Sequence, residues 1–150
     1  MADLRMEMSE PACRLQYRVI YGDTDAGSIV YYANYLRFME IGRNELMRNL
    51  AVPYSEIERD GIIIPVTECH LRYKAPAHYD DLITIATCLA ELTRWSCRFH
   101  YRISCQREDK DLLLVKGFTK HACINRQGKL VSFSEKILAL TSKIRPPKKV

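Results

Sequence analysis

The order of the predicted elements indicates an α+β fold in which one long helix packs on an antiparallel sheet. A strand pattern near the N-terminus is followed by a long helical pattern, and four further strand patterns then follow one another with only turns between them. Because no helix separates the later strands, a parallel sheet of strand–helix–strand units is not expected. The length of 150 residues suits one domain with its own core.

Hydrophobic spacing predicts the first strand and the helix. Apolar residues alternate with polar ones from residue 14, which is the period of a half-buried strand whose inner face consists of Leu15, Tyr17, Val19 and Tyr21. Over residues 32–50 the spacing changes to three and four, and the apolar stripe of this helix consists of Tyr35, Met39, Gly42, Leu46 and Leu50. A glycine within a helix costs about 1 kcal/mol relative to alanine. Gly42 is therefore explained if the helix lies very close to the sheet, although simple tolerance is the alternative.

The remaining elements are predicted from alternation and from turn residues. The expected strands cover residues 67–74, 82–92, 97–105 and 112–124. Charged or glycine-containing turns follow two of them, at 108–111 and 125–128. Short helical segments are expected at 54–60 and 134–142. We expect a disordered segment at residues 1–12, a single domain at 13–142 and a basic tail at 143–150.

Composition limits the function classes. The net charge is +5, and much of it lies in the tail, as expected for a solvated end or for a phosphate-bearing ligand. The six cysteines form no C-x-x-C pair and show no metal-ligand spacing with histidine, so free thiols, no metal site and no cofactor are expected. Without an apolar signal segment or a membrane span, the protein is expected in the cytoplasm. Nucleic-acid binding is not expected, because aromatic residues are not interleaved with lysine and arginine on one clear strand platform.

Two segments carry a resemblance to a known family. The sequence YGDTDAGSIVYYANY at residues 21–35 resembles the D-x-D-x-x-G-x-V-Y-x-x-x-Y motif of the 4-hydroxybenzoyl-CoA thioesterase family, and most closely its YbgC-like acyl-CoA thioesterase branch. Ser28 stands where glycine is common. Residues 73–81, YKAPAHYDD, resemble a second family segment, and the likeness extends from about residue 13 to about residue 141. The resemblance implies the hotdog fold, with a five-stranded antiparallel sheet wrapped around one long central helix.

The resemblance also implies the catalytic residues. The family's catalytic aspartate falls on Asp25, and its polarising backbone N–H, at the start of the long helix, falls near Tyr32. Elementary chemistry agrees, because the first N–H groups of a helix are unpaired and attract the negative charge that develops on a thioester oxygen. The Asp25 carboxylate can attack the carbonyl carbon or activate water, and the sequence does not choose between these roles.

Neighbouring residues have plainer interpretations. An aspartate before a helix is usually a capping or turn residue, and in Asp25 the motif outweighs that interpretation. Asp23 is expected to brace the loop by accepting from backbone N–H groups. Glu40 is a candidate second acid or base, or a solvated helix residue. Tyr32 stands where many YbgC-like proteins have histidine, and a phenol that titrates near ~10 cannot replace an imidazole near neutral pH.

The resemblance further implies where the substrate and a second subunit bind. Ile64, Pro65 and Val66 resemble a strand entry that flanks pantetheine, and Arg94 lies in a turn that carries basic nucleotide contacts in some family members. Arg98 and Arg102 are expected to be solvated sheet residues. A sheet edge and a half-formed site favour a homo-oligomer, in which subunits form a dimer and dimers form a tetramer, with the site shared between subunits.

Three functions remain open from the sequence. The first is an acyl-CoA thioesterase. The second is an aryl-CoA thioesterase of the hydroxybenzoyl or dihydroxynaphthoyl type, and the third is a non-catalytic module that binds acyl-CoA or an acyl-carrier protein.

Overall fold

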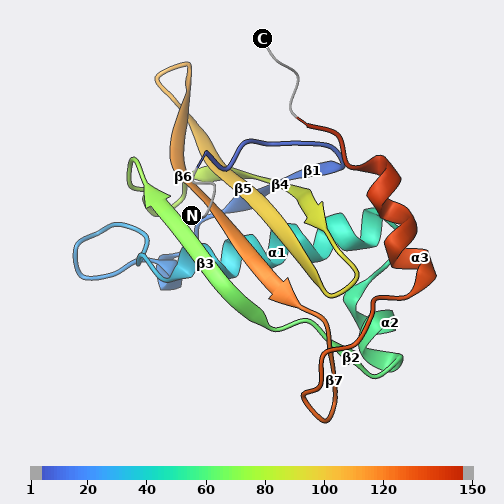
Figure 1. Cartoon of the computed structure of the whole chain (residues 1–150). Helices are drawn as coiled ribbons and strands as arrows, with labels where there is room; N and C mark the ends of the chain where they lie inside the picture. The colour runs from blue at the N-terminus through green and yellow to red at the C-terminus, as the bar shows by residue number, and fades with distance from the viewer. Residues whose placement is uncertain (1–4, 147–150) are drawn as a thin grey trace.

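The computed structural model describes residues 5–146 and contains a five-stranded antiparallel sheet that curves around one helix (Figure 1). The strands, in their order across the sheet, are β1 (Ala12–Arg18), β4 (Leu82–Leu92), β5 (Ser96–Arg107), β6 (Lys110–Ala122) and β3 (Val66–Tyr73). Neighbouring strands are all antiparallel. The predicted α+β class and five-stranded sheet are therefore confirmed. β3 lies at one edge of the sheet, and most of its residues are exposed.

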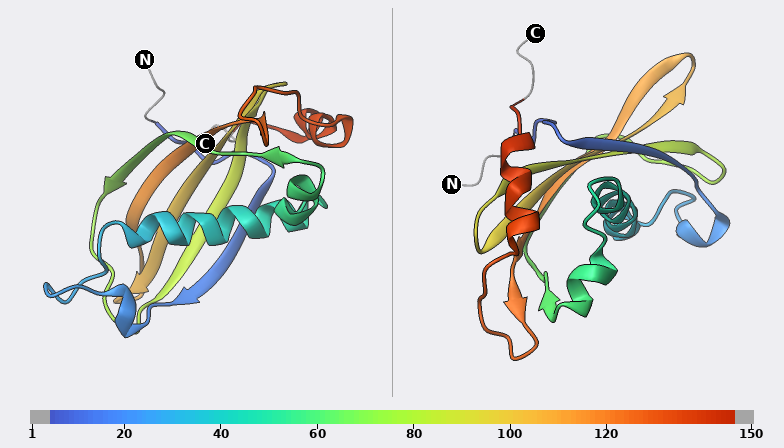
Figure 2. Two further views of the ribbon diagram at one scale, coloured as in Figure 1. Left: turned by 90° about the horizontal axis from the view of Figure 1, so that it is seen from below. Right: turned by 90° about the vertical axis from the view of Figure 1, so that its right-hand side faces the viewer.

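The helix α1 (Asn34–Asn49) lies against the concave face of the sheet (Figure 2). With 16 residues it begins two residues later than expected and ends one residue earlier. A Cβ atom on Gly42 would lie 2.8 Å from Ile85 Cγ2 and closer still to Thr87 Oγ1, both on β4. Real Cβ atoms do not approach other atoms this closely, so glycine at this position allows the helix to pack directly on the sheet.

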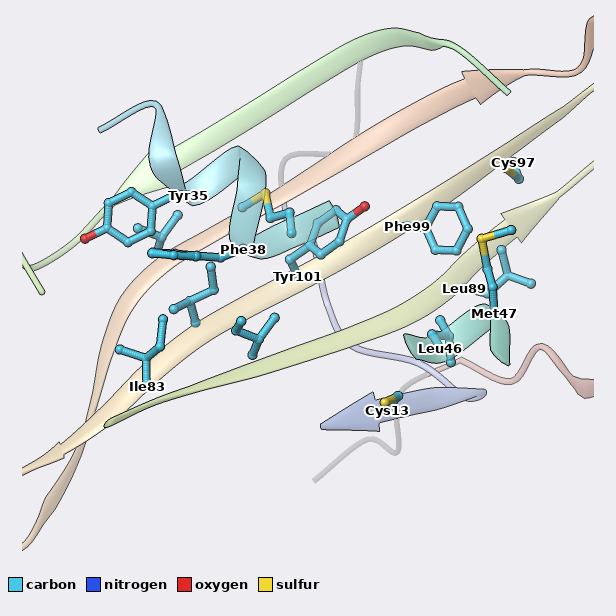
Figure 3. Packing of buried hydrophobic residues seen from close by; sticks show 14 of the residues in the cluster. Cys13, Tyr35, Phe38, Leu46, Met47, Ile83, Leu89, Cys97, Phe99 and Tyr101 are labelled. Atoms are coloured by element: carbon cyan, nitrogen blue, oxygen red, sulfur yellow. The ribbon is translucent and has the colours of Figure 1, made fainter. Parts of the chain in front are cut away.

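The core fills the space between α1 and the sheet (Figure 3). The inner face of β5 is buried as predicted, and it consists of Cys97, Phe99, Tyr101, Ile103 and Cys105. On α1, Phe38 and Met47 are buried beside the expected stripe, whereas Leu50 is only partly buried. The buried stripe is therefore wider than the predicted one, as expected for a helix embraced by a curved sheet.

Short elements close the open end of the sheet. They are α2 (Tyr54–Arg59), α3 (Glu135–Leu138) with the 3-10 turn Ala139–Lys143, and a small sheet of β2 (Ile62–Ile63) and β7 (Ile124–Asn125). Ser134 begins α3, because its Oγ accepts from the Ile137 N–H at 3.3 Å. The predicted turn at 125–128 forms around the Asn125 carboxamide, which accepts from the N–H groups of Gln127 and Lys129.

The segment before β1 departs from the expected disorder at residues 1–12. Residues 1–4 lie outside the described residues, but Met6 has no exposed surface and the Glu7 carbonyl contacts His100 Nδ1 at 2.6 Å. This segment covers the outer face of the sheet and buries Arg98, whose guanidinium lies 3.8 Å from the centre of the Phe118 ring. The expectation of a solvated Arg98 was therefore wrong, because the sequence pattern did not reveal the covering segment.

The other end of the chain joins the same layer. Arg145 and Glu10 exchange backbone hydrogen bonds of 2.9 and 3.0 Å, so the beginning of the predicted tail is paired, while residues 147–150 lie outside the described residues. Tyr21, expected on the buried face of the first strand, is 79% exposed because β1 ends at Arg18 and the chain turns away. Within residues 5–146, no helix combines the length and the apolar character that crossing a membrane requires.

Candidate active site

A tight loop carries the motif to the beginning of α1. The Tyr31 N–H donates to the Asp23 carbonyl and the Asp25 N–H donates to the Ile29 carbonyl, each at 2.9 Å. Residues 23–25 therefore lie antiparallel to residues 29–31. This pairing holds Asp25 directly opposite Ile29, a few residues before the helix begins.

Asp23 braces this loop, as predicted. Its side chain has no exposed surface, and its Oδ2 accepts from the Tyr17 hydroxyl at 2.8 Å and from the Ile20 N–H at 3.0 Å. Arg37, on the first turns of α1, lies 3.6 Å from the other carboxylate oxygen. A buried carboxylate needs such partners, and these contacts tie the loop to both β1 and α1.

Asp25 is exposed at the surface of the loop. One carboxylate oxygen, Oδ1, accepts from the Gly27 N–H at 2.8 Å, which fixes the orientation of the side chain. The pKa of the Tyr31 phenol is raised by a hydrogen bond with Tyr32, by the charge of Tyr32 and, to a smaller extent, by the charge of Asp25. The carboxylate is close enough for its charge to act on the Tyr31 phenol, and its other oxygen, Oδ2, accepts no hydrogen bond from residues 5–146.

The helix terminus offers fewer bare N–H groups than expected. The Asn34 N–H donates to the Tyr31 carbonyl and the Leu36 N–H donates to the Ala33 carbonyl. The N–H of Tyr32 donates to no acceptor within residues 5–146, and the Tyr32 carbonyl accepts from the Tyr73 hydroxyl at 3.0 Å. Tyr32 precedes the first residue of α1 by two positions, and its N–H, like that of Ala33, has no acceptor among residues 5–146.

A pocket of about 350 Å³ opens beside this donor. Its lining consists of Ile29, Val30, Tyr32, Tyr35, Tyr73, Lys74, Ala75 and Pro76. Both sequence motifs contribute to it, because Ile29 to Tyr35 come from the first and Tyr73 to Pro76 come from the second. The Tyr35 hydroxyl accepts from the Ala77 N–H at 3.2 Å and joins the two segments. We call this the tyrosine pocket; Asp25 lies opposite Ile29 at its side rather than in its lining.

A second pocket of about 310 Å³ lies farther along α1. It is lined by three of the predicted substrate-binding residues, Ile64, Pro65 and Val66, and also by Glu40, Arg43, Asn44, Met47, Tyr54, Phe99 and His121. We call it the Arg43 pocket. Glu40 therefore faces this pocket and does not line the tyrosine pocket of its own chain. Arg94 lines neither pocket, since it is exposed in the β4–β5 turn, 6.0 Å from the Trp95 ring centre.

A buried chain of hydrogen bonds forms one wall of the Arg43 pocket. Arg43 Nη1 donates to the Tyr101 hydroxyl at 3.0 Å. The same hydroxyl lies 2.6 Å from Thr119 Oγ1. His121 contacts Thr119 Oγ1 through Nε2 at 2.8 Å and the Ile64 carbonyl through Nδ1 at 3.1 Å. A carbonyl can only accept, so Nδ1 carries the proton, and every bond then runs in one direction from Arg43 to Ile64.

The same surroundings keep His121 neutral. Burial first, and then the positive charge of Arg43, lower the pKa of His121 to about 4, while the bond to the Ile64 carbonyl opposes the shift. Burial also raises the pKa of the Tyr101 hydroxyl, against the effect of Arg43. Arg43 is therefore the charged end of an otherwise neutral chain near physiological pH.

Sequence reasoning did not single out Arg43, Tyr101, Thr119 or His121. One signal was present, since the alternation of β5 placed Tyr101 on the buried face, where a tyrosine hydroxyl needs a partner. The identity of that partner depends on the pairing of β5 with β6, which local patterns do not specify. Among residues 5–146, no group of histidine, cysteine and acidic side chains could hold a metal ion.

Comparisons with known proteins assign the family. Residues 19–140 match the thioesterase-like superfamily, and the chain therefore belongs to it. The chain is 33% identical over 125 residues to the acyl-CoA thioesterase YbgC of Haemophilus influenzae, covering 81% of this chain and 88% of the relative. It is 31% identical over 104 residues to the 4-hydroxybenzoyl-CoA thioesterase of a Pseudomonas species, covering 67% and 74%.

Solved structures agree with this assignment. A hypothetical protein from Aquifex aeolicus has a TM-score of 0.78 at 32% identity, covering 86% of this chain and 98% of the other. A gentisyl-coenzyme A thioesterase has a TM-score of 0.75 at 25% identity, covering 84% and 99%. The predicted membership of the hotdog thioesterase family is thus confirmed.

Proposed function

We propose that this chain hydrolyses acyl-CoA thioesters to a free acid and coenzyme A, with Asp25 and the Tyr32 N–H as its catalytic groups. The observation that carries the proposal is the segment of residues 23–32, which presents a carboxylate and an unpaired backbone donor beside the tyrosine pocket. Family membership and the named relatives support thioester hydrolysis as the reaction.

The chemistry assigns a role to each group. The Tyr32 N–H donates to the thioester oxygen as it becomes negative, which lowers the barrier to attack. The Asp25 carboxylate then attacks the carbonyl carbon and releases the CoA thiolate, giving a mixed anhydride that water hydrolyses to the free acid and the Asp25 carboxylate, or it removes a proton from a water molecule that attacks the thioester directly. Both routes end in the free acid and CoA, and both require the carboxylate in its charged form.

The exposed edge of β3 supports a site shared by two subunits. When two copies of β3 pair antiparallel about a two-fold axis, the Tyr73 end of one strand lies beside the Val66 end of the other. Tyr73 lines the tyrosine pocket and Val66 lines the Arg43 pocket, so pairing joins the two pockets into one groove across the interface. The pairing also protects eight residues of unpaired strand edge.

This groove defines the expected binding of CoA. Ile64, Pro65 and Val66 of one subunit line the part of the groove that continues the tyrosine pocket of the other and contact the substrate there, and the exposed Arg94 is available to the phosphates of CoA at the surface. A tetramer formed from two such dimers and a location in the cytoplasm remain predictions from the sequence.

An aryl-CoA substrate is the second candidate. Tyr32, Tyr35 and Tyr73 contribute three aromatic rings to the tyrosine pocket, and aromatic groups pack well against one another in offset or edge-to-face arrangements. The relative from Pseudomonas, a 4-hydroxybenzoyl-CoA thioesterase, supports this choice.

Release of the CoA thiol from a panel of alkyl and aryl thioesters tests the proposal. We expect steady turnover of some members, with the ratio of kcat/KM values deciding between the two substrate classes. Tight binding of acyl-CoA without thiol release over hours would instead identify a binding module and overturn the proposal.

A further inference from the structure

The Arg43 guanidinium has donors that the protein does not use. Arg43 is half-buried, and a guanidinium has five N–H donors, of which one bond, to Tyr101, is formed here. No carboxylate of residues 5–146 forms an ion pair with Arg43, although Glu40 lines the same pocket from its exposed rim. The unused donors therefore lie at a pocket that can admit a ligand.

The hydrogen-bond chain holds this guanidinium in place. Tyr101, Thr119 and His121 are each no more than 3% exposed, and together they connect Arg43 to the carbonyl of Ile64. Because the chain is buried and each of its members is bonded on both sides, the position of the guanidinium is fixed relative to Ile64 and Pro65. A donor that is already oriented binds an acceptor at little additional cost in conformational entropy.

The polar groups of the Arg43 pocket limit which acyl groups can place their far end in it. A plain alkyl end would remove water from the guanidinium without replacing the lost hydrogen bonds, which is costly. An oxygen acceptor would restore those bonds, and a carboxylate would accept two of them from the planar fork of the guanidinium. Because Glu40 is also present, a neutral hydroxyl group could be accepted as well, donating to Glu40 while it accepts from Arg43.

We propose that Arg43 is a specificity-determining residue that selects acyl groups bearing an oxygen acceptor, a carboxylate or a hydroxyl, at the end remote from the thioester. The inference rests on the proposed thioesterase function and names the substrate class for that site. In the paired dimer, the Arg43 pocket of one subunit continues the tyrosine pocket of the other, so the thioester and the acyl end are held by different chains.

The test compares acyl groups that differ only at their far end. Hexanoyl-CoA, 6-hydroxyhexanoyl-CoA and adipoyl-CoA are assayed as one series, and decanoyl-CoA, 10-hydroxydecanoyl-CoA and sebacoyl-CoA as a longer one. In at least one series we expect kcat/KM for an oxygen-tipped member to exceed that of its alkyl counterpart by about 10-fold or more. Comparing the hydroxyl member with the carboxylate member of each series shows which of the two acceptors is preferred.

The variant Arg43→Met keeps the length of the side chain and removes its donors. It should abolish the preference by raising KM for the oxygen-tipped substrate more than KM for the alkyl substrate. Arg43→Lys, which keeps the charge, should recover part of the preference. Arg48→Met is the matched control, because Arg48 is exposed on the same helix and pairs with Glu45, and this variant should retain the wild-type ratio.

Binding separates failure of this inference from failure of the proposed function. Thioether analogues of the same acyl groups cannot be hydrolysed, and their affinities are measured by calorimetry for wild type and Arg43→Met. A preference for oxygen-tipped analogues that Arg43→Met abolishes supports the inference even if turnover is absent. Equal affinities and equal kcat/KM within each series would overturn it while leaving the thioesterase assignment intact.

Discussion

The beginning and the middle of α1 differ in exposure and in the number of contacts that fix their side chains. At its beginning, Asp25 and the Tyr32 N–H are exposed and lie beside an open pocket at the edge of the sheet. Farther along, Gly42 lies directly on β4, and Arg43 is connected to a fully bonded buried chain. The first region holds the proposed catalytic groups, which have few contacts within the chain, and the second is fixed by packing before any ligand arrives.

The difference indicates where changes should affect chemistry and where they should affect folding. Groups at the beginning of α1 have few contacts to lose, so their replacement should alter turnover and leave stability unchanged. Groups in the middle of α1 are surrounded by the core, so their replacement should alter the free energy of unfolding first.

Replacing Asp25 should have the largest effect. Asp25→Asn removes the charge that attacks or activates water, and we expect kcat to fall by about 10²- to 10⁴-fold. Urea unfolding should show an unchanged midpoint, since the side chain is exposed. Asp111→Asn, on the exposed β5–β6 hairpin, serves as the control and should retain full activity. Full turnover by Asp25→Asn would remove the proposed catalytic group.

Low pH should lower the free energy of unfolding through His121. The ordinary pKa of histidine is about 6.5, and the pKa of His121 is lowered to about 4. Between these two values the imidazole is protonated in the unfolded state and neutral in the folded state. The contribution of neutral His121 to stability is therefore complete above pH ~6.5. It is lost as the pH decreases toward ~4, by up to about 3 kcal/mol. Urea unfolding at several pH values measures this slope, and His121→Gln should make it shallower.

A methyl group at Gly42 should destabilise the fold. Gly42→Ala places a Cβ against Thr87 and Ile85, and we expect a loss of about 1 to 3 kcal/mol in the free energy of unfolding despite the better helix propensity of alanine. Gly22→Ala is the matched control, because its nearest atom would lie 3.9 Å away. A stabilised Gly42→Ala protein would contradict the close packing of α1 on β4.

Removing the Tyr32 hydroxyl should have the smallest effect. In our proposal Tyr32 acts through its backbone N–H, which Tyr32→Phe retains, so kcat should remain within about 2-fold of wild type. Steady-state kinetics on the best substrate measures this. A fall comparable to that of Asp25→Asn would show that the phenol itself takes part in the chemistry.

The sequence predicted most of the fold, because local spacing reports local structure. The alternation of β5, the stripe of α1 and the turn at 125–128 were all visible as patterns. The covering of Arg98 by the segment around Met6 was not visible, since it joins residues that are far apart in the sequence. The same reason explains Tyr21, whose alternation continues past the point where β1 ends.

The residues of the candidate site also fall into those that local sequence patterns predicted and those that depend on distant segments coming together. Asp25 and Tyr32 came from a motif and the Ile64–Val66 segment from a looser likeness to the family, and each of them lies at or beside a pocket. Arg94 came from a weaker analogy and lies away from both pockets. The chain from Arg43 to Ile64 was missed because it needs α1, β5, β6 and the segment between β2 and β3 to come together, and no single segment contains its pattern.

A mixed dimer tests the central claim, which is that one active site takes Asp25 from one subunit and the Val66 side of the groove from the other. Asp25→Asn removes the carboxylate, and Val66→Trp fills the groove, so each homodimer should be inactive. A heterodimer of the two variants, purified with two different affinity tags, contains one intact shared site and should recover roughly half of the wild-type kcat. A heterodimer no more active than its parents would place both groups in the same subunit and contradict the shared site.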